Sequence, residues 1–207
     1  VPMPPGQQLD AELNALFDWW ESRTDPGLMV LDAAMFHYQF ETLHTFTDGN
    51  GRIGRLLILL QLMRRGMLKQ PLVSISPWLE SRRAEYQDLL LGVSSHGAWE
   101  DWIVFFCQAI EESADTAYNQ IVELERIRDR YRARLSAYGA STRRLAEELI
   151  GVPYVSVPIV VRRLQMSRSS ASNAIRNLVK EQVLVPLSGG SSRTVMYVAP
   201  EVLNAVR

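Results

Sequence analysis

The twelve residues from His44 to Arg55 combine side chains that could act together on a nucleotide. His44 has the one side chain whose ordinary pKa suits general-base work near neutral pH. Asp48 offers a hard oxygen ligand for a Mg²⁺ ion that keeps most of its waters and bridges phosphates. Arg52 and Arg55 are spaced i, i+3, so they project from one helix face, where each guanidinium group can bind two phosphate oxygens. These residue types predict a nucleotide-using transferase.

The backbone between the two groups of side chains adds an anion site. Gly49, Asn50 and Gly51 are residue types that turn through positive φ, and the turn leads directly into a helical pattern. The first backbone N–H groups of a helix have no partners within it and lie at the positive end of its dipole. The turn therefore predicts a cradle for a phosphate group.

The same stretch resembles the signature of the Fic family, HxFx(D/E)GNGRxxR, and matches it at every defining position. Most members carry Pro directly after the His, where this chain has Thr45, a change that loosens the loop entry without removing a chemical group. The resemblance covers roughly the first two thirds of the chain. The last third is similar to winged-helix modules found downstream in such proteins.

The resemblance implies a nucleotidyltransferase that moves AMP from ATP to a Ser, Thr or Tyr hydroxyl of a target protein, with Mg²⁺ and release of pyrophosphate. It makes His44 the base for the attacking hydroxyl and Asp48 the magnesium ligand. The residues it assigns to the phosphates of ATP are Gly49, Asn50, Gly51, Arg52 and Arg55. Gly51 at its motif position favours nucleotidyl transfer over simple phosphate transfer.

Two other functions stay open at the level of sequence. One is the reverse reaction, hydrolytic removal of AMP from modified targets, which some family members perform with an extra glutamate. The other is a regulator that acts through the winged helix. The family's inhibitory motif, Ser/Thr-x-x-x-Glu-Gly/Asn, has no match here, since Ser81 to Glu85 has the spacing but is followed by Tyr86.

Composition favours an ordinary globular protein of the cytoplasm with no membrane association. Hydrophobic residues make up 47% and charged residues 22% of the 207 positions. The longest apolar runs, such as residues 53–63, are too short to span a bilayer, and no leader opens the chain. The single cysteine, Cys107, lies among apolar residues and is expected to be a buried thiol. The Pro-rich opening suggests that the chain starts just after the family's target-docking flap.

Apolar periodicity predicts a mainly α protein: a Fic-type helical bundle over residues 1–138, then a small winged helix-turn-helix domain over residues 139–207. The helices expected in the bundle span about residues 9–20, 28–43, 52–65, 76–92 and 99–138. Beyond a boundary at Gly139, the expected elements are helices 143–150, 157–164 and 169–180 and strands 183–187 and 194–198. Gly189 and Gly190 would join the strands as a hairpin.

Charge is unevenly distributed along the chain. Residues 141–207 carry nine Lys/Arg and four Asp/Glu, a net charge of +5, which leaves −6 for residues 1–140. This asymmetry is compatible with DNA binding through the third helix of the second domain. The expected DNA contacts are Arg168, Ser169, Ser170, Asn173 and Arg176. Winged helices also serve as dimerisation or protein-docking surfaces, so a homo-oligomer is the alternative.

Three further residues near the motif receive structural interpretations. His37 has no third ligand at suitable spacing for a metal site and is expected to be buried against the motif helix. Glu41 is expected on the helix surface, and Phe46 is expected to anchor the loop to the core.

Overall fold

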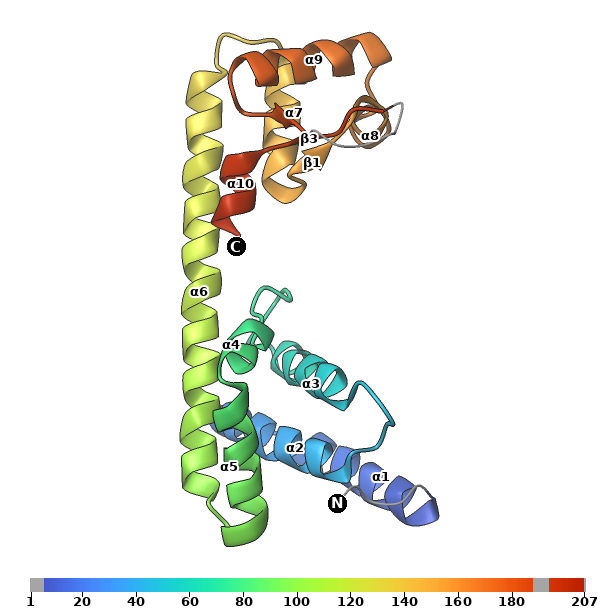
Figure 1. The fold of residues 1–207 in the computed structure, drawn as a ribbon, viewed down its shortest axis with the longest axis vertical. Helices are drawn as coiled ribbons and strands as arrows, with labels where there is room; N and C mark the ends of the chain where they lie inside the picture. The colour runs from blue at the N-terminus through green and yellow to red at the C-terminus, as the bar shows by residue number, and fades with distance from the viewer. Residues whose placement is uncertain (1–5, 188–193, 207) are drawn as a thin grey trace. The chain divides into compact units, whose positions relative to one another are not determined.

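The structure, a computed structural model, describes residues 6–187 and 194–206 and is mainly helical, as the sequence predicts (Figure 1). The first helices are α1 (Gln7–Ser22), η1 (Pro26–Leu28), α2 (Met29–Leu43), α3 (Asn50–Arg64), α4 (Ser76–Ser81), α5 (Arg83–His96) and α6 (Trp99–Arg134). They are followed by α7 (Ala140–Gly151), β1 (Tyr154–Val155), α8 (Val157–Leu164), α9 (Arg168–Lys180), β2 (Val185–Pro186), β3 (Tyr197–Val198) and α10 (Pro200–Ala205). No helix in these two ranges is both long and apolar enough to cross a bilayer.

The chain forms two compact units, Val1–Ala117 and Tyr118–Arg207, so the division falls inside α6. The sequence places the boundary later, at Gly139, which is the residue that precedes α7. The difference arises because the second half of α6 contributes Ile127 and Tyr131, and the turn after it contributes Leu135, to the same apolar core as α7 to α9. An unbroken helical pattern does not reveal that the apolar partners of a helix change halfway along it.

In the first unit, helices α2 and α3 follow each other in the chain and are joined by one loop (Figure 1). Two apolar clusters pack against this pair. Leucines and aromatic rings of α1 and α2 form one of them, where the ring centroids of Trp20 and Phe36 lie 5.5 Å apart. The other cluster joins α2, α3, α4, α5 and the first half of α6 around Trp102, which is fully buried. The indole N–H of Trp102 donates to the carbonyl of Ala34 at 3.0 Å, which fixes α6 against α2.

Two expectations for the first unit are wrong. The segment predicted as one helix over residues 76–92 forms two helices, because the helical conformation is interrupted at Arg82. The second helix continues to His96 and is ended by Gly97, which has a φ of 68°. Cys107 is exposed rather than buried. Its neighbours Phe105 and Phe106 take the inward positions of α6, so the helical phase carries the thiol outward.

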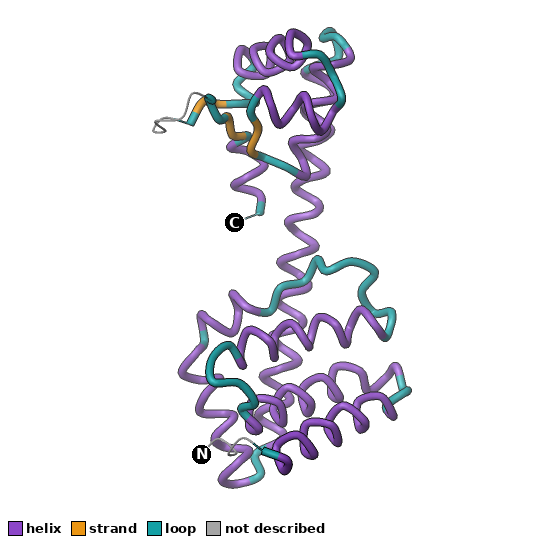
Figure 2. Tube along the Cα trace, turned by 90° about the vertical axis from the view of Figure 1, so that its right-hand side faces the viewer, coloured by secondary structure: helices purple, strands orange, loops and turns teal. Residues whose placement is uncertain are grey.

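The second unit packs α7, α8, α9 and the end of α6 with a small antiparallel sheet in the order β1-β3-β2 (Figure 2). Tyr154 and Val185 both pair with Val198, one from each neighbouring strand. Strand β1 and helix α10 are not among the predicted elements. The predicted hairpin residues Gly189 and Gly190 lie outside the described residues, as does the Pro-rich opening.

Candidate functional site

The loop between α2 and α3 is closed by the side chain of Asn50, the first residue of α3. Its Oδ1 accepts from the backbone N–H of Phe46 at 2.9 Å, and its Nδ2 donates to the carbonyl of Phe46 at 2.6 Å. Asn50 is only 3% exposed, so these bonds lie inside the protein. Phe46 itself is 43% exposed, with its ring centroid 6.5 Å from that of Phe40. The buried amide, more than the aromatic ring, therefore holds the loop in shape.

Two residues of this loop adopt left-handed backbone conformations. His44 ends α2 at φ 51°, ψ 52°, and its N–H donates to the carbonyl of Phe40 at 3.2 Å. Gly49 precedes α3 at φ 91°, a backbone conformation that residues with a Cβ atom rarely adopt. The turn at His44 costs on the order of 1–3 kcal/mol, so the surrounding loop must enforce it. The consequence is that the imidazole projects from the exposed end of α2.

Helices α2 and α3 approach closely at Gly54. A Cβ atom there would lie 2.6 Å from Oε1 of Glu41 and 2.9 Å from Cε1 of His37. His37 is fully buried, as predicted, and its Nε2 is 2.9 Å from the hydroxyl of Tyr86 on α5. Burial lowers the pKa of His37 to about 4, so its ring is neutral at physiological pH. Neutral His37 is therefore a structural link between α2, α3 and α5.

The two arginines of the motif have different environments. The Nη2 atom of Arg52 donates to Oδ2 of Asp48 at 3.0 Å, in a pair that is largely exposed. The Nε atom of Arg55 donates to Oγ of Ser76 at the start of α4, also at 3.0 Å, and the residue is half-buried. Arg55 is thus oriented by the fold, whereas Arg52 is held only by a surface ion pair.

A cleft of about 300 Å³ brings most of the predicted residues together. The motif residues that line it are Asp48, Gly49, Gly51, Arg52 and Arg55. The opposite wall comes from α4 and α5 and includes Arg83, Tyr86 and Gln87. Neither His44 nor Asn50 is among the residues that line this cleft, although both belong to the loop at its edge.

Glu41 also lines the cleft, which corrects the prediction that it is a helix-surface residue. Its Oε1 is buried with no hydrogen-bond partner among the described residues. Burial raises the pKa of the Glu41 carboxyl, an effect that the positive charges of Arg55 and His44 partly oppose. A signal was present in the sequence, because Glu41 follows His37 by four residues and so shares its inward-facing side of α2.

The comparison with protein families agrees with this geometry. Residues 1–62 match the Fic/DOC family model. The matching segment contains α1, α2, the loop and most of α3, and with them the whole Fic motif from His44 to Arg55. The N-terminal part of the chain is therefore homologous to Fic proteins.

Named relatives match a longer stretch of the chain than the 62 residues of the family model. A protein of Nematostella vectensis named protein adenylyltransferase Fic is 36% identical over 117 residues, which is 56% of this chain and 25% of the relative. Its namesake from Culex quinquefasciatus is 35% identical over 115 residues, which is 55% of this chain and 22% of the relative. The similarity thus spans about a quarter of the length of these curated relatives.

A solved structure resembles nearly the whole chain. The crystal structure of a Fic family protein from Desulfovibrio desulfuricans G20 aligns with 95% of this chain and 56% of its own, with a TM-score of 0.50 and 22% sequence identity. At this identity the likeness concerns the fold. It supports a Fic-like helical architecture that carries a small three-stranded antiparallel sheet near the C-terminus.

The oxygen ligands at the Fic motif suit a Mg²⁺ ion that is bound mainly by water and substrate. Asp48 supplies a single exposed carboxylate, and one of its oxygens already accepts from Arg52. The described residues contain no cluster of three or more His, Cys, Asp or Glu side chains that could enclose a metal ion. One carboxylate suits a Mg²⁺ ion that keeps most of its waters and is held jointly with substrate phosphates.

The residues predicted to contact DNA lie on α9 in the second unit. Arg168, Ser169, Asn173 and Arg176 are exposed, as expected of a contact surface. Ser170 is half-buried, and its hydroxyl lies 2.9 Å from that of Ser167, the residue that caps α9. The capping bond runs from the backbone N–H of Ser170 to Oγ of Ser167 at 3.1 Å.

Proposed function

We propose that the chain transfers AMP from ATP to a hydroxyl side chain of a target protein. The observation that carries the proposal is the cleft in which motif glycines, one carboxylate and two arginines share a wall. Such a wall offers hydrogen-bond donors and positive charge for a polyphosphate, with a site for one metal ion beside them. The relatives named protein adenylyltransferase support the same reaction by homology.

In this reaction the oxygen of the target hydroxyl forms a bond to the α-phosphorus of ATP, and the bond from that phosphorus to the bridging oxygen breaks. Pyrophosphate leaves, and His44 takes the proton of the hydroxyl. The exposed position of His44 at the end of α2 suits this role, because the hydroxyl arrives from another protein. Bound Mg²⁺ would neutralise charge on the phosphates, held on the protein side by Asp48.

The backbone and the arginines would supply the electrostatic part of catalysis. The N–H groups after Gly49 begin α3 without helical partners and would stabilise the charge that grows on the transferred phosphate. Asn50 contributes indirectly by keeping the loop closed through its bonds to Phe46. Arg55, oriented by Ser76, would hold the leaving phosphates in a fixed position.

Arg52 must leave its ion pair with Asp48 to bind substrate, and the free energy needed to break this pair is small. Its pair with Asp48 is exposed, with side-chain exposures of 73% and 89%, and such surface pairs contribute about 0–1 kcal/mol. Breaking the pair frees Arg52 for phosphate and Asp48 for the metal ion. The Asp48–Arg52 contact is therefore compatible with a resting state of the site.

The test is incubation with Mg²⁺ and α-³²P-ATP in the presence of a cell lysate, beside a parallel incubation with γ-³²P-ATP. AMP transfer labels protein from the α position only, whereas phosphate transfer labels it from the γ position. His44→Ala should lower labelling at least about 100-fold, since general-base catalysis contributes 10²–10⁴-fold. The variant should still bind mant-ATP, because His44 is not among the residues lining the phosphate cleft.

The matched control is His96→Ala. His96 is an exposed histidine at the end of α5 whose ring bonds to the neighbouring Ser95, so its loss should leave labelling unchanged. Label from γ-³²P-ATP that appears only when the chain is added would contradict AMP transfer, since kinases of the lysate label their own substrates with or without it. Loss of mant-ATP binding together with labelling in His44→Ala would contradict the role of His44 as base.

A second candidate is the reverse reaction, hydrolysis of AMP from a modified protein. Glu41 favours it, because a partly buried carboxyl with a raised pKa beside Arg55 is suited to accept a proton from an attacking water. Glu41→Gln should abolish release of ³²P-AMP from prelabelled protein and leave AMP transfer intact. Equal loss of both activities would exclude a dedicated hydrolytic role.

A further inference from the structure

The acidic residues of the second unit are all neutralised by neighbouring arginines. Residues 118–207 contain 14 Lys/Arg and seven Asp/Glu. Each of the seven carboxylates lies within ion-pair distance of an arginine, and six of them pair with arginines of α6. The seventh, Glu148, pairs with Arg163 of α8.

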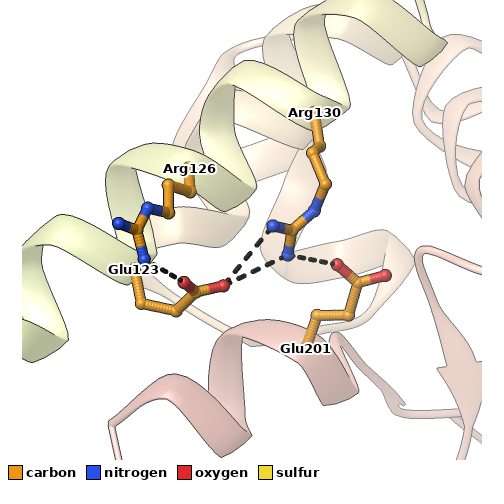
Figure 3. A network of polar contacts seen from close by, with 4 residues as sticks. All are labelled: Glu123, Arg126, Arg130 and Glu201. Atoms are coloured by element: carbon orange, nitrogen blue, oxygen red, sulfur yellow. Dashed lines mark hydrogen bonds and ion pairs between the residues drawn. The ribbon is translucent and has the colours of Figure 1, made fainter.

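Figure 3 shows one part of this network. Arg130 lies between Glu123 of α6 and Glu201 of α10, at 3.3 and 3.2 Å, and Arg126 approaches Glu123 at 3.5 Å. The arginines of α6 are thus largely occupied by carboxylates of the same unit. They contribute little net positive charge to its surface.

The cations of α7, α8 and α9 are arranged differently. Six of them form no ion pair with any residue that the structure describes: Arg143, Arg144, Arg162, Arg168, Arg176 and Lys180. All six are exposed. The excess positive charge of the described part of this unit therefore lies on its three helices rather than on α6. Uncompensated cations on a protein surface attract a polyanion.

Helix α9 presents the matching shape. Its apolar residues Ala171, Ala174, Ile175 and Leu178 are buried, which turns the opposite face outward. That outer face carries Ser169, Asn173, Arg176 and Lys180, all exposed and spaced by four, three and four residues. A straight helix with one polar, basic face has the width that the major groove of B-DNA admits.

The outer face is also ordered before any partner arrives. The guanidinium Nη1 of Arg176 donates to Oδ1 of Asn173 at 3.2 Å. At the inner side of the helix, Nδ2 of Asn177 donates to Oγ1 of Thr142 at 3.0 Å and ties α9 to α7. Asn and Arg are the residue types that make bidentate contacts with adenine and guanine. Preordering of such side chains lowers the entropy lost on binding.

We infer that the second unit binds duplex DNA, with the outer face of α9 in the major groove and the unpaired arginines of α7 and α8 on the flanking phosphates. The inference does not depend on AMP transfer by the first unit. An acidic protein surface is the rival partner for the same cations. DNA is favoured because Asn173 lies among the cations of α9 at helical spacing. Its amide can contact a base edge, whereas attraction to an acidic protein surface requires only the positive charges.

The test is fluorescence anisotropy of a fluorescein-labelled 24-base-pair duplex of mixed sequence, titrated with the full chain at 50, 100 and 200 mM KCl. We expect log Kd to rise linearly with log [KCl], with a slope near 0.9 for each phosphate neutralised. Three to four such contacts would weaken binding on the order of 100-fold between 50 and 200 mM KCl. Absence of binding at 50 mM KCl and 20 µM protein would overturn the inference.

Two variants and a matched control locate the surface. Arg162→Gln should weaken binding several-fold and lower the salt slope by about one contact, and Arg176→Gln should weaken binding about tenfold or more. Arg126→Gln removes the same charge from an exposed arginine of α6 that pairs with Glu123, and should change Kd less than twofold. Circular dichroism melts of the three variants should match the wild type, because all three side chains are exposed.

Two results would contradict the assignment to α9 and to DNA. Equal weakening by Arg126→Gln would mean that only net charge matters. Displacement of the labelled duplex by polyglutamate as effectively as by unlabelled duplex, at equal charge concentration, would favour the acidic protein surface instead.

Discussion

Replacement of Gly54 by alanine tests the close approach of α2 and α3 that shapes the cleft. The new methyl group would lie 2.6 Å from Oε1 of Glu41 and 2.9 to 3.0 Å from the ring of His37. These distances are too short for carbon, so a neighbour must move. His37 cannot move easily, because it is fully buried and bonded to Tyr86. We therefore expect Gly54→Ala to push the two helices apart.

The expected loss follows from two opposing effects. Overpacking of a well-packed site costs about 1–3 kcal/mol. Alanine in place of glycine inside a helix returns about 1 kcal/mol. The net destabilisation is then about 0–2 kcal/mol, which lowers the urea midpoint by up to about 1 M for an m value near 2 kcal/mol/M.

Tryptophan fluorescence measures this effect in the first unit alone, because all five tryptophans lie there. They are Trp19, Trp20, Trp78, Trp99 and Trp102. The matched control is Gly92→Ala in α5, where the added methyl group would meet only Cβ of Ala98 at 3.6 Å, an ordinary contact. Gly92→Ala should raise the urea midpoint through helix propensity. If Gly54→Ala raises it equally, the close approach of α2 and α3 is refuted.

Two further predictions use the same fluorescence signal. Asn50→Ala should cost about 1–3 kcal/mol, because it leaves the N–H and carbonyl of Phe46 without their partner, and a urea midpoint equal to that of the wild type would contradict this role for the loop. The pKa of His37 is about 4 in the folded protein and 6.5 as the ordinary value, so the unfolded chain binds more protons between these limits. Stability should therefore fall by about 3 kcal/mol as pH drops from 6.5 to 4, and His37→Gln should remove that part of the pH dependence. An unchanged pH profile of the urea midpoint in His37→Gln would show that other groups cause it.

The sequence predicted the helical class, most helix limits and the residues of the motif, because each depends on local properties. Helix periodicity, the glycines of the loop and the spacing of Arg52 and Arg55 are all read within a few residues. The two helices of residues 76–96 were predicted as one, since nothing local marks the break at Arg82. The short strand β1 was missed for a related reason, because its partner Val198 is distant in sequence.

What the sequence by itself determined is the chemistry available to this protein: an imidazole, a carboxylate, two guanidinium groups and a glycine-rich turn at fixed spacing. Tertiary structure alone decided that Ser76 orients Arg55 and that the amide of Asn50 closes the loop. It also decided which arginines of the second unit keep their charge free. The physical reason is that local spacing fixes the direction of a side chain from its own helix. Its burial, its pKa and its partner depend on which other helix packs against it.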